Sequence, residues 1–189
     1  MGKGGRVLIV VTGPIAAGKS TFAARLADEV RSAGRSVAVV DLDEVVFMVR
    51  NLPDTTLEEL WDMGRTVHAR LVDAFVRAGI EVVIVDGPFH DDRERAALLD
   101  VLALDGDPVW ITLVVSYEEA LRRARADSSR GLSKDPDFLR RTYDAFWAAR
   151  ATLVAPEPTH DTEHVSAGDL ARTVAAGLPL STGSGWEPD

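Results

Sequence analysis

The chain has 189 residues, a formal net charge of −9 and no cysteine. Without thiols it can form no disulfide, cysteine nucleophile or zinc–thiolate site, which fits a cytoplasmic protein. Its acidity disfavours binding to a nucleic-acid backbone, and no stretch of the sequence is long and apolar enough to span a membrane. We therefore expect a cytoplasmic monomer or homodimer with neither nucleic acid nor membrane as a partner.

Short β-branched runs alternate with amphipathic segments along the chain, which is typical of an α/β protein whose parallel sheet is covered on both faces. The length predicts a single domain over residues 1–178, followed by a flexible C-terminal tail, 179–189. The strands are predicted at 6–12, 36–40, 80–85, 109–115 and 160–165. The helices are predicted at 19–33, after Asp43, at 56–78 and 92–104, after Ser116, at 136–153 and after Ser166.

Residues 13–21, Gly-Pro-Ile-Ala-Ala-Gly-Lys-Ser-Thr, match the phosphate-binding pattern G-x-x-x-x-G-K-[ST] between a predicted strand and a predicted helix. Main-chain N–H groups of such a loop converge on phosphate oxygens, helped by the helix dipole. Lys19 is expected to reach the β- and γ-phosphates, and Ser20 to bind Mg²⁺. The predicted nucleotide-binding residues are Gly13, Ala16, Ala17, Gly18, Lys19, Ser20 and Thr21.

Carboxylates follow the second predicted strand at Asp41 and Asp43. A kinase that phosphorylates a hydroxyl gains from a carboxylate that orients the hydroxyl and accepts its proton. Asp43 is the first choice for this base. Asp41 is the second choice, or a group that contacts the substrate or lies near the Mg²⁺. The alternative is that Asp43 only caps a helix over 45–50.

Asp86 ends the third predicted strand, where it is expected to hold Mg²⁺ through water or to contact the substrate. Gly87 follows it instead of a water-activating glutamate, which favours group transfer over hydrolysis. The alternative role for Asp86 is a loop cap. Arg93 or Arg95 is a candidate clamp for an anionic group, or a solvated charge, and His90 is interpreted as a polar loop residue.

Arginines are concentrated between Leu121 and Gly131. Phosphoryl transfer spreads negative charge over the moving group, so a cationic lid that excludes water would serve it. Arg125 and Arg130 are the preferred catalytic arginines, and Arg122 is next, as a nucleotide contact. The alternative is a solvated helix paired with Glu118 and Glu119.

Most aromatic side chains in the predicted helices are expected to pack in the core. The segment 51–70 occupies the acceptor side in such folds, so Trp61, Arg65 and His68 are candidates for a substrate pocket. One stripe of the helix from Thr56 is predicted to be apolar. It contains Leu57, Leu60, Trp61, Gly64, His68, Leu71, Val72 and Phe75.

The chain resembles small P-loop kinases of the nucleoside-monophosphate-kinase-like fold, especially chloramphenicol phosphotransferase, adenylylsulfate kinase and zeta-toxin-type kinases. Asp41-Leu-Asp43 and the segment 87–93 resemble motifs of adenylylsulfate kinases, and Asp43 also resembles the hydroxyl-activating position of chloramphenicol phosphotransferase. The arginines at 122–130 are similar to the lid arginines of these kinases. Residues 160–162 are similar to the segment that precedes the last helix of their fold. The resemblance implies a P-loop NTPase fold with strand order 2-3-1-4-5 and an arginine-bearing lid.

Together these features predict an Mg²⁺-dependent phosphotransferase that moves the γ-phosphoryl group of ATP or GTP to a hydroxyl of a small molecule. Gly87 and the segment 51–65 depart from adenylylsulfate kinases, so an antibiotic or another natural product is the favoured acceptor. The alternatives are an adenylylsulfate- or nucleotide-type metabolic kinase, a regulatory nucleotide-binding switch and a nucleic-acid end kinase. The guanine-selecting motif Asn/Thr-Lys-x-Asp is absent, which disfavours the regulatory switch. The acidic net charge disfavours the nucleic-acid end kinase.

Overall fold

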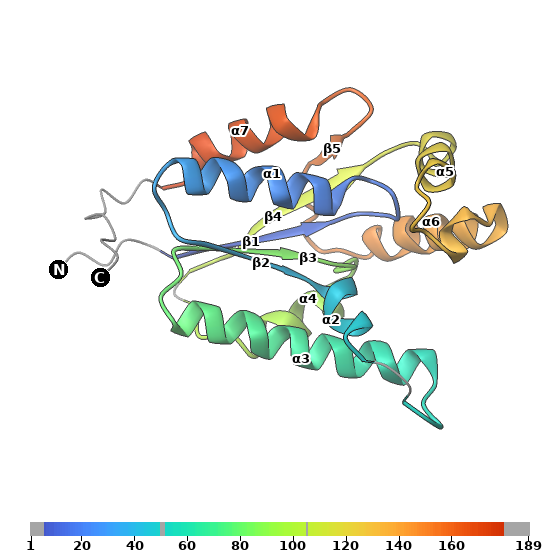
Figure 1. Ribbon diagram of the computed structural model, residues 1–189, viewed down its shortest axis with the longest axis horizontal. Coiled ribbons are helices and arrows are strands. Elements are labelled where there is room, and N and C mark those ends of the chain that lie inside the picture. The colour runs from blue at the N-terminus through green and yellow to red at the C-terminus, as the bar shows by residue number, and fades with distance from the viewer. Residues whose placement is uncertain (1–5, 50–51, 105, 180–189) are drawn as a thin grey trace.

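The computed structural model describes residues 6–49, 52–104 and 106–179. Five parallel strands form one sheet in the order β2-β3-β1-β4-β5 (Figure 1). This confirms the predicted order and the α/β class. The strands are β1 (Val7–Thr12), β2 (Val37–Asp41), β3 (Val82–Asp86), β4 (Val109–Val114) and β5 (Thr159–Asp161).

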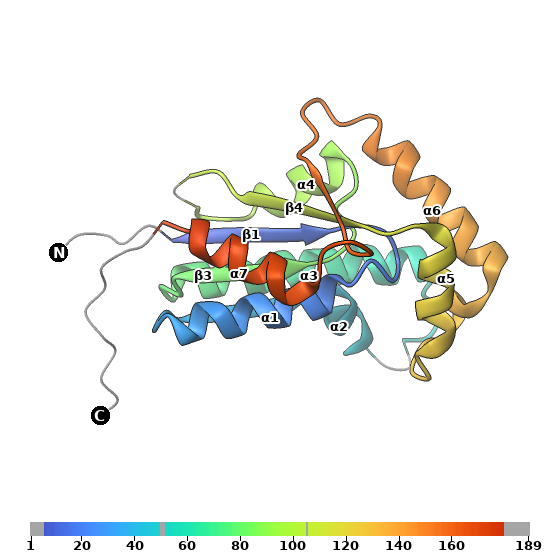
Figure 2. The ribbon, with the colours of Figure 1, turned by 90° about the horizontal axis from the view of Figure 1, so that it is seen from above.

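Helices cover both faces of the sheet and its carboxyl edge (Figures 1 and 2). Helices α1 and α7 lie on one face of the sheet, and α3 and α4 lie on the other. Helices α5 and α6 lie beyond the carboxyl ends of the strands. Figure 2 shows the position of α5 and α6 most clearly. The helices are α1 (Lys19–Ser32), α2 (Leu42–Phe47), α3 (Leu57–Arg77), α4 (Asp92–Leu99), α5 (Tyr117–Ala126), the short 3₁₀ helix η1 (Leu132–Lys134), α6 (Pro136–Arg150) and α7 (Ala167–Gly177).

The central strand β1 is buried along its whole length, and its side chains alternate between two cores. Ile9 and Val11 join the cluster beneath α1 and α7, while Leu8 and Val10 join the cluster beneath α3 and α4. A strand with apolar side chains on both faces is stable only in the middle of a layered fold. The apolar run that precedes the glycine loop therefore anchors that loop to the buried centre of the sheet.

Side-chain caps fix where several helices begin. Thr56 and Glu59 form a reciprocal capping box at the start of α3, as the sequence predicts. Ser116 and Ser166 cap α5 and α7 as predicted. The alternative role of Asp43 as the cap of the short helix is wrong, because the carboxylate of Asp41 accepts the hydrogen bond from the main-chain N–H of Asp43. Asp43 therefore does not cap α2.

The apolar stripe predicted for α3 is only partly correct. Gly64, His68 and Val72 are buried, but Leu57 is 67% exposed because the first turns of α3 project past the sheet. Membrane-spanning helices are not found among the described residues, since none has the necessary length and apolarity. Except for Pro179, the predicted tail at 179–189 lies outside the described residues.

Candidate active site

The glycine loop leaves β1 with main-chain conformations that residues with a Cβ rarely adopt. Gly13 has φ +143°, and a Cβ there would lie 2.1 Å from the carbonyl oxygen of Leu113 in β4. Gly18 has φ +90° directly before α1, and Ala16 also has a positive φ, of 63°. The loop thus approaches the neighbouring strand closely and ends at a helix N-terminus, whose main-chain N–H groups and dipole favour an anion. This is the arrangement expected of a phosphate-binding loop.

Sheet register brings two carboxylates to the first turn of α1. Asp41 and Asp86 end neighbouring strands and are paired in register. The hydroxyl of Ser20 lies within hydrogen-bond distance of the carboxylates of both, with Oγ–Oδ2 distances of 2.7 Å to Asp86 and 3.1 Å to Asp41. A hydroxyl and two carboxylates are hard oxygen donors of the kind that Mg²⁺ prefers. These residues therefore fit the predicted metal.

The electrostatics of this trio also fit a cation. Burial, opposed by the charge of Lys19 and aided by the nearby carboxylates of Asp41 and Asp43, raises the pKa of Asp86 to about 6. The side chain of Asp86 is almost fully buried at 2% exposure. A bound cation would remove this penalty, because an opposite charge favours the ionised carboxylate.

Asp43 and Lys19 share a cavity of about 390 Å³ with the glycine loop. Asp43 is exposed to solvent at the cavity mouth, yet desolvation by the protein around it raises its pKa, whereas the charge of Lys19 lowers it and Asp41 raises it. A carboxylate with a raised pKa is a better proton acceptor than an ordinary aspartate. The Nζ atom of Lys19 lies 3.4 Å from the carbonyl oxygen of Pro14.

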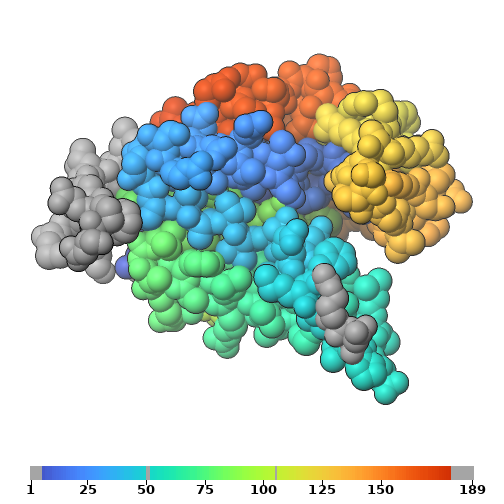
Figure 3. Space-filling view, viewed as in Figure 1, coloured from blue at the N-terminus to red at the C-terminus, as the bar shows by residue number. Residues whose placement is uncertain are grey.

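The cavity has two halves. The donor half is the Gly13–Thr21 loop with Arg130. The acceptor half brings together residues from α2, α3, the loop after β3 and α6. Figure 3 shows the cyan segment of α2 and α3 separated from the yellow and orange segment of α5 and α6. The residues that line the acceptor half are Asp43, Trp61, Arg65, Asp86, Gly87, Pro88, His90, Phe138 and Thr142.

Of the predicted arginines, Arg130 lines the cavity, where it pairs with Asp127. Arg122 and Arg125 do not line it. Arg122 is mostly exposed and paired with Glu119, as in the alternative of a solvated helix, and Arg125 is exposed. The predicted roles of these two arginines thus have no support from their positions.

Arg123 was missed by the sequence reasoning, although it is the arginine that joins α5 to the loop. Its guanidinium donates to the carbonyl oxygens of Ala16, at 3.4 Å, and of Thr162, at 3.0 Å. The hydroxyl of Thr162 donates in turn to the carbonyl oxygen of Ala17 at 3.0 Å. The buried Ala120 and Ala124 mark the inner face of α5, and Arg123 lies nearer to that face than Arg122 or Arg125.

Two predicted substrate residues lie elsewhere. Arg93 lines a separate groove of about 380 Å³ between α3 and α4. His68 is buried at 1% exposure, and its Nε2 donates to the carbonyl oxygen of Val40 at 3.1 Å. His68 therefore packs α3 onto β2 and faces no pocket, while Trp61 and Arg65 from the same helix do line the cavity.

His90 lines the acceptor half, although the sequence indicated only a polar loop residue. Burial, together with the charge of Lys19, lowers its pKa to about 4. The imidazole is therefore neutral at neutral pH. Its Nε2 atom is buried and has no hydrogen-bond partner among the described residues. The signal for this position was its place in the loop after β3, but a histidine in a loop is more often an ordinary polar residue than a catalyst.

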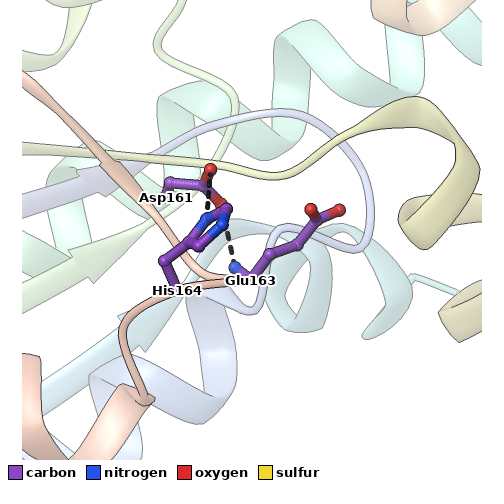
Figure 4. A group of neighbouring side chains, drawn as sticks. All are labelled: Asp161, Glu163 and His164. Carbon is purple, nitrogen blue, oxygen red and sulfur yellow. Dashed lines mark hydrogen bonds and ion pairs between the residues drawn. The ribbon is translucent and has the colours of Figure 1, made fainter.

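Asp161, Glu163 and His164 form a separate group in the loop after β5 (Figure 4). The carboxylate of Asp161 accepts hydrogen bonds from the main-chain N–H of Glu163 and from Nδ1 of His164, both at 2.9 Å. The carboxylate of Glu163 is itself bonded to Ser116 at the start of α5. These side chains already satisfy one another, so the group stabilises the loop that carries Thr162.

A P-loop followed by two strand-end carboxylates, on a sheet of order 2-3-1-4-5, defines the small P-loop kinase fold. The family model that matches residues 8–156 is that of an AAA domain, AAA_33. The chain belongs to this AAA-domain family of P-loop proteins. No curated protein matches its sequence.

Solved structures with a similar fold span almost the whole chain. The tunicamycin resistance protein of Deinococcus radiodurans has a TM-score of 0.66 at 18% identity, over 93% of this chain and 97% of that one. A candidate kinase from Chloroflexus aurantiacus has a TM-score of 0.65 at 20% identity, over 92% and 98%. A sugar kinase from Janibacter sp. HTCC2649 has a TM-score of 0.55 at 21% identity, over 90% and 92%. At these identities the likeness establishes the fold.

Proposed function

We propose that the protein is an Mg²⁺-dependent phosphotransferase that moves the γ-phosphoryl group of ATP or GTP to a hydroxyl of a small molecule. The observation that carries the proposal is the shared cavity, in which Asp43 faces the same space as Lys19 and the glycine loop. A slowly hydrolysing switch has no need of a second compartment beside the phosphates. The acceptor half supplies that compartment.

In the proposed reaction, the loop N–H groups and Lys19 hold the triphosphate, and Asp43 takes the proton of the acceptor hydroxyl. The hydroxyl oxygen then bonds to the γ-phosphorus, while the bond from that phosphorus to the β–γ bridging oxygen breaks and releases the nucleoside diphosphate. Lys19 and Arg130 stabilise the negative charge on the moving group. Mg²⁺, held by Ser20 and Asp86, would supply further charge neutralisation.

The acceptor proposed here is a natural-product hydroxyl, such as that of an antibiotic. Support comes from the half-buried aromatic residues in the cavity and, as an analogy of fold, from the tunicamycin resistance protein among the similar structures. Analogy of fold alone does not transfer a substrate. The acceptor must therefore be identified by direct assay.

The test is incubation of the protein with Mg²⁺, ATP or GTP, and a panel of sugars, nucleosides and antibiotics that includes tunicamycin. Mass spectrometry would detect a product that has gained one phosphoryl group. We expect such a product with the natural protein and none with Lys19→Met. Slow release of inorganic phosphate without any phosphorylated acceptor, together with triphosphate-dependent binding to another protein, would contradict the proposal and favour the switch.

A further inference from the structure

The acceptor half of the cavity contains two aromatic side chains that the core does not use. Trp61 from α3 and Phe138 from α6 are both half-buried and both line the cavity. In the described part of the chain, neither belongs to the two hydrophobic clusters, whereas Phe75 and Tyr143 on the same helices pack against them. Large aromatic surfaces held beside a polar reaction centre are typical of pockets that bind a ring.

Charge in the acceptor half is unfavourable to an anion. Arg65 is the cationic residue of this half, and its Nη2 lies 3.2 Å from a carboxylate oxygen of Asp62. Burial raises the pKa of Glu94, and Arg65 lies close enough to that carboxyl to oppose the rise. Recognition of a phosphate or sulfate ester relies on arginine donors that are free to form paired hydrogen bonds. Here the arginine is already paired, and Asp43 and Asp86 add negative charge.

A neutral polar contact is nevertheless present. The hydroxyl of Thr142 lines the cavity and donates to the carbonyl oxygen of Leu139 at 2.8 Å, so its lone pairs can accept a hydrogen bond from a ligand. His90 contributes an uncharged ring to the same wall. The lining therefore offers apolar area with a few uncharged polar groups, which suits a neutral molecule.

We infer that the acceptor is an uncharged, ring-bearing alcohol, whose ring packs against Trp61 and Phe138 while its hydroxyl meets Asp43. This inference depends on the proposed function, and it excludes nucleoside monophosphates and adenylylsulfate as the preferred acceptors. It also assigns Trp61 and Phe138 as specificity-determining residues.

The substrate test compares molecules that differ in one property. Uridine and adenosine are neutral ring-bearing alcohols, their 5′-monophosphates carry the same rings with charge, and xylitol is a neutral alcohol without a ring. With ATP and GTP as donors, we expect kcat/KM for the better nucleoside to exceed that for its monophosphate and for xylitol by at least about tenfold. Preference for a monophosphate, or equal use of xylitol, would overturn the inference and leave the phosphotransferase proposal intact. Failure of every acceptor here, and of every member of the wider panel that includes antibiotics, would overturn both.

The variant test separates a binding role from a structural one. Trp61→Ala and Phe138→Ala are expected to raise KM for the accepted nucleoside about tenfold each, as loss of one stacking partner does, with the Kd of the triphosphate unchanged. Trp147→Ala is the matched control, because Trp147 is 47% exposed on α6 and does not line the cavity. Trp61→Phe should restore most of the lost affinity. Equal effects of the control would contradict the assignment.

Charge is tested through Asp62. Asp62→Asn removes the partner of Arg65 and leaves the cavity lining itself unchanged. We expect it to improve kcat/KM for the monophosphate severalfold relative to the nucleoside, because the guanidinium becomes free to bind the phosphate. An unchanged ratio would show that the pairing of Arg65 does not exclude anions.

Discussion

The donor half and the acceptor half of the cavity are constructed in different ways. Apart from Arg130, the donor half is one continuous segment, Gly13–Thr21, whose shape is set by two glycines and by the start of α1. The acceptor half joins Asp43, Trp61, the segment 86–90 and Phe138, which are distant in sequence. A local motif carries its own geometry, whereas an assembled surface depends on packing across the whole fold. The two halves should therefore respond differently to mutation.

Lys19→Met is expected to have the largest effect on the donor half. Loss of the ammonium group removes the charge that faces the phosphates, and transfer should fall by at least about a thousandfold. The thermal unfolding temperature should stay close to that of the natural protein, since Lys19 makes one weak contact with the loop. Lys134→Met is the control, because this lysine lies outside the cavity. Transfer at the natural rate would refute the donor role of the loop.

Asp43→Asn tests the acceptor half at its reactive group. We expect kcat to fall by about a hundredfold to ten-thousandfold, the usual contribution of a general base, while the Kd of the triphosphate remains unchanged. The control is Glu44→Gln, an exposed neighbour in the same turn of α2. A natural kcat in Asp43→Asn would transfer the role of base to Asp41 or Asp86.

The sequence predicted the glycine loop of the donor half well because everything in that loop is local. The glycine pattern, the buried strand before it and the helix after it are contiguous, and the strand order follows from the family resemblance. Asp41, Asp43 and Asp86 were also identified, because the carboxyl ends of parallel strands meet at one edge of the sheet. That Asp41 and Asp86 lie side by side, within reach of Ser20, required the sheet register.

The acceptor half was harder to predict because the position of a residue along α3 decides whether it meets the cavity or the core. Trp61 and His68 are seven residues apart on α3, yet Trp61 lines the cavity and His68 is buried against β2. The first turns of α3 extend past the sheet, so the same stripe of the helix meets the cavity at one end and the core at the other. Sequence periodicity predicts which residues share one face of α3, but it does not predict where along the helix the sheet ends.

Glu157 tests the ion pairs that join α4 to α6, the helix that carries Phe138. This carboxylate joins Arg95 of α4 to Arg150 of α6, with N–O distances of 2.9 and 3.1 Å, and its side chain is 13% exposed. Glu157→Gln leaves the two arginines without a charged partner, and we expect a loss of about 3 kcal/mol in the free energy of unfolding. Chemical denaturation measures this loss. Asp28→Asn, which breaks an exposed pair with Arg31, should change stability far less.

The same carboxylate gives a pH dependence. Burial alone would raise the pKa of Glu157, but hydrogen bonds from Arg95 and Thr112 lower it to about 2, below its ordinary value of 4.5. The stabilisation is therefore complete above pH 4.5 and is lost as the pH falls towards 2. The difference in stability between the natural protein and Glu157→Gln should shrink across this interval. A constant difference would contradict the low pKa.

Gly64→Ala should disturb the acceptor half alone. A Cβ at Gly64 would lie 2.3 Å from Cγ2 of Val46, so α3 must move away from α2, the helix that carries Asp43. We expect a loss of about 1–3 kcal/mol in stability and a raised KM for the acceptor, with the Kd of the triphosphate unchanged. Gly177→Ala is the matched control, because a Cβ there meets nothing within 4 Å. A weaker affinity for the triphosphate would show that the two halves are mechanically coupled.

The smallest effects should come from α5, where Arg123→Ala and Arg122→Ala form a matched pair. Arg123 is bonded to Ala16 and Thr162, so its loss should weaken triphosphate binding by about 1–2 kcal/mol. Arg122 is mostly exposed and contacts Glu119, so its loss should leave binding unchanged. Isothermal titration with a non-hydrolysable triphosphate measures both. A larger effect at Arg122 would mean that α5 rotates when the nucleotide binds, which would make the donor half less local than the loop alone suggests.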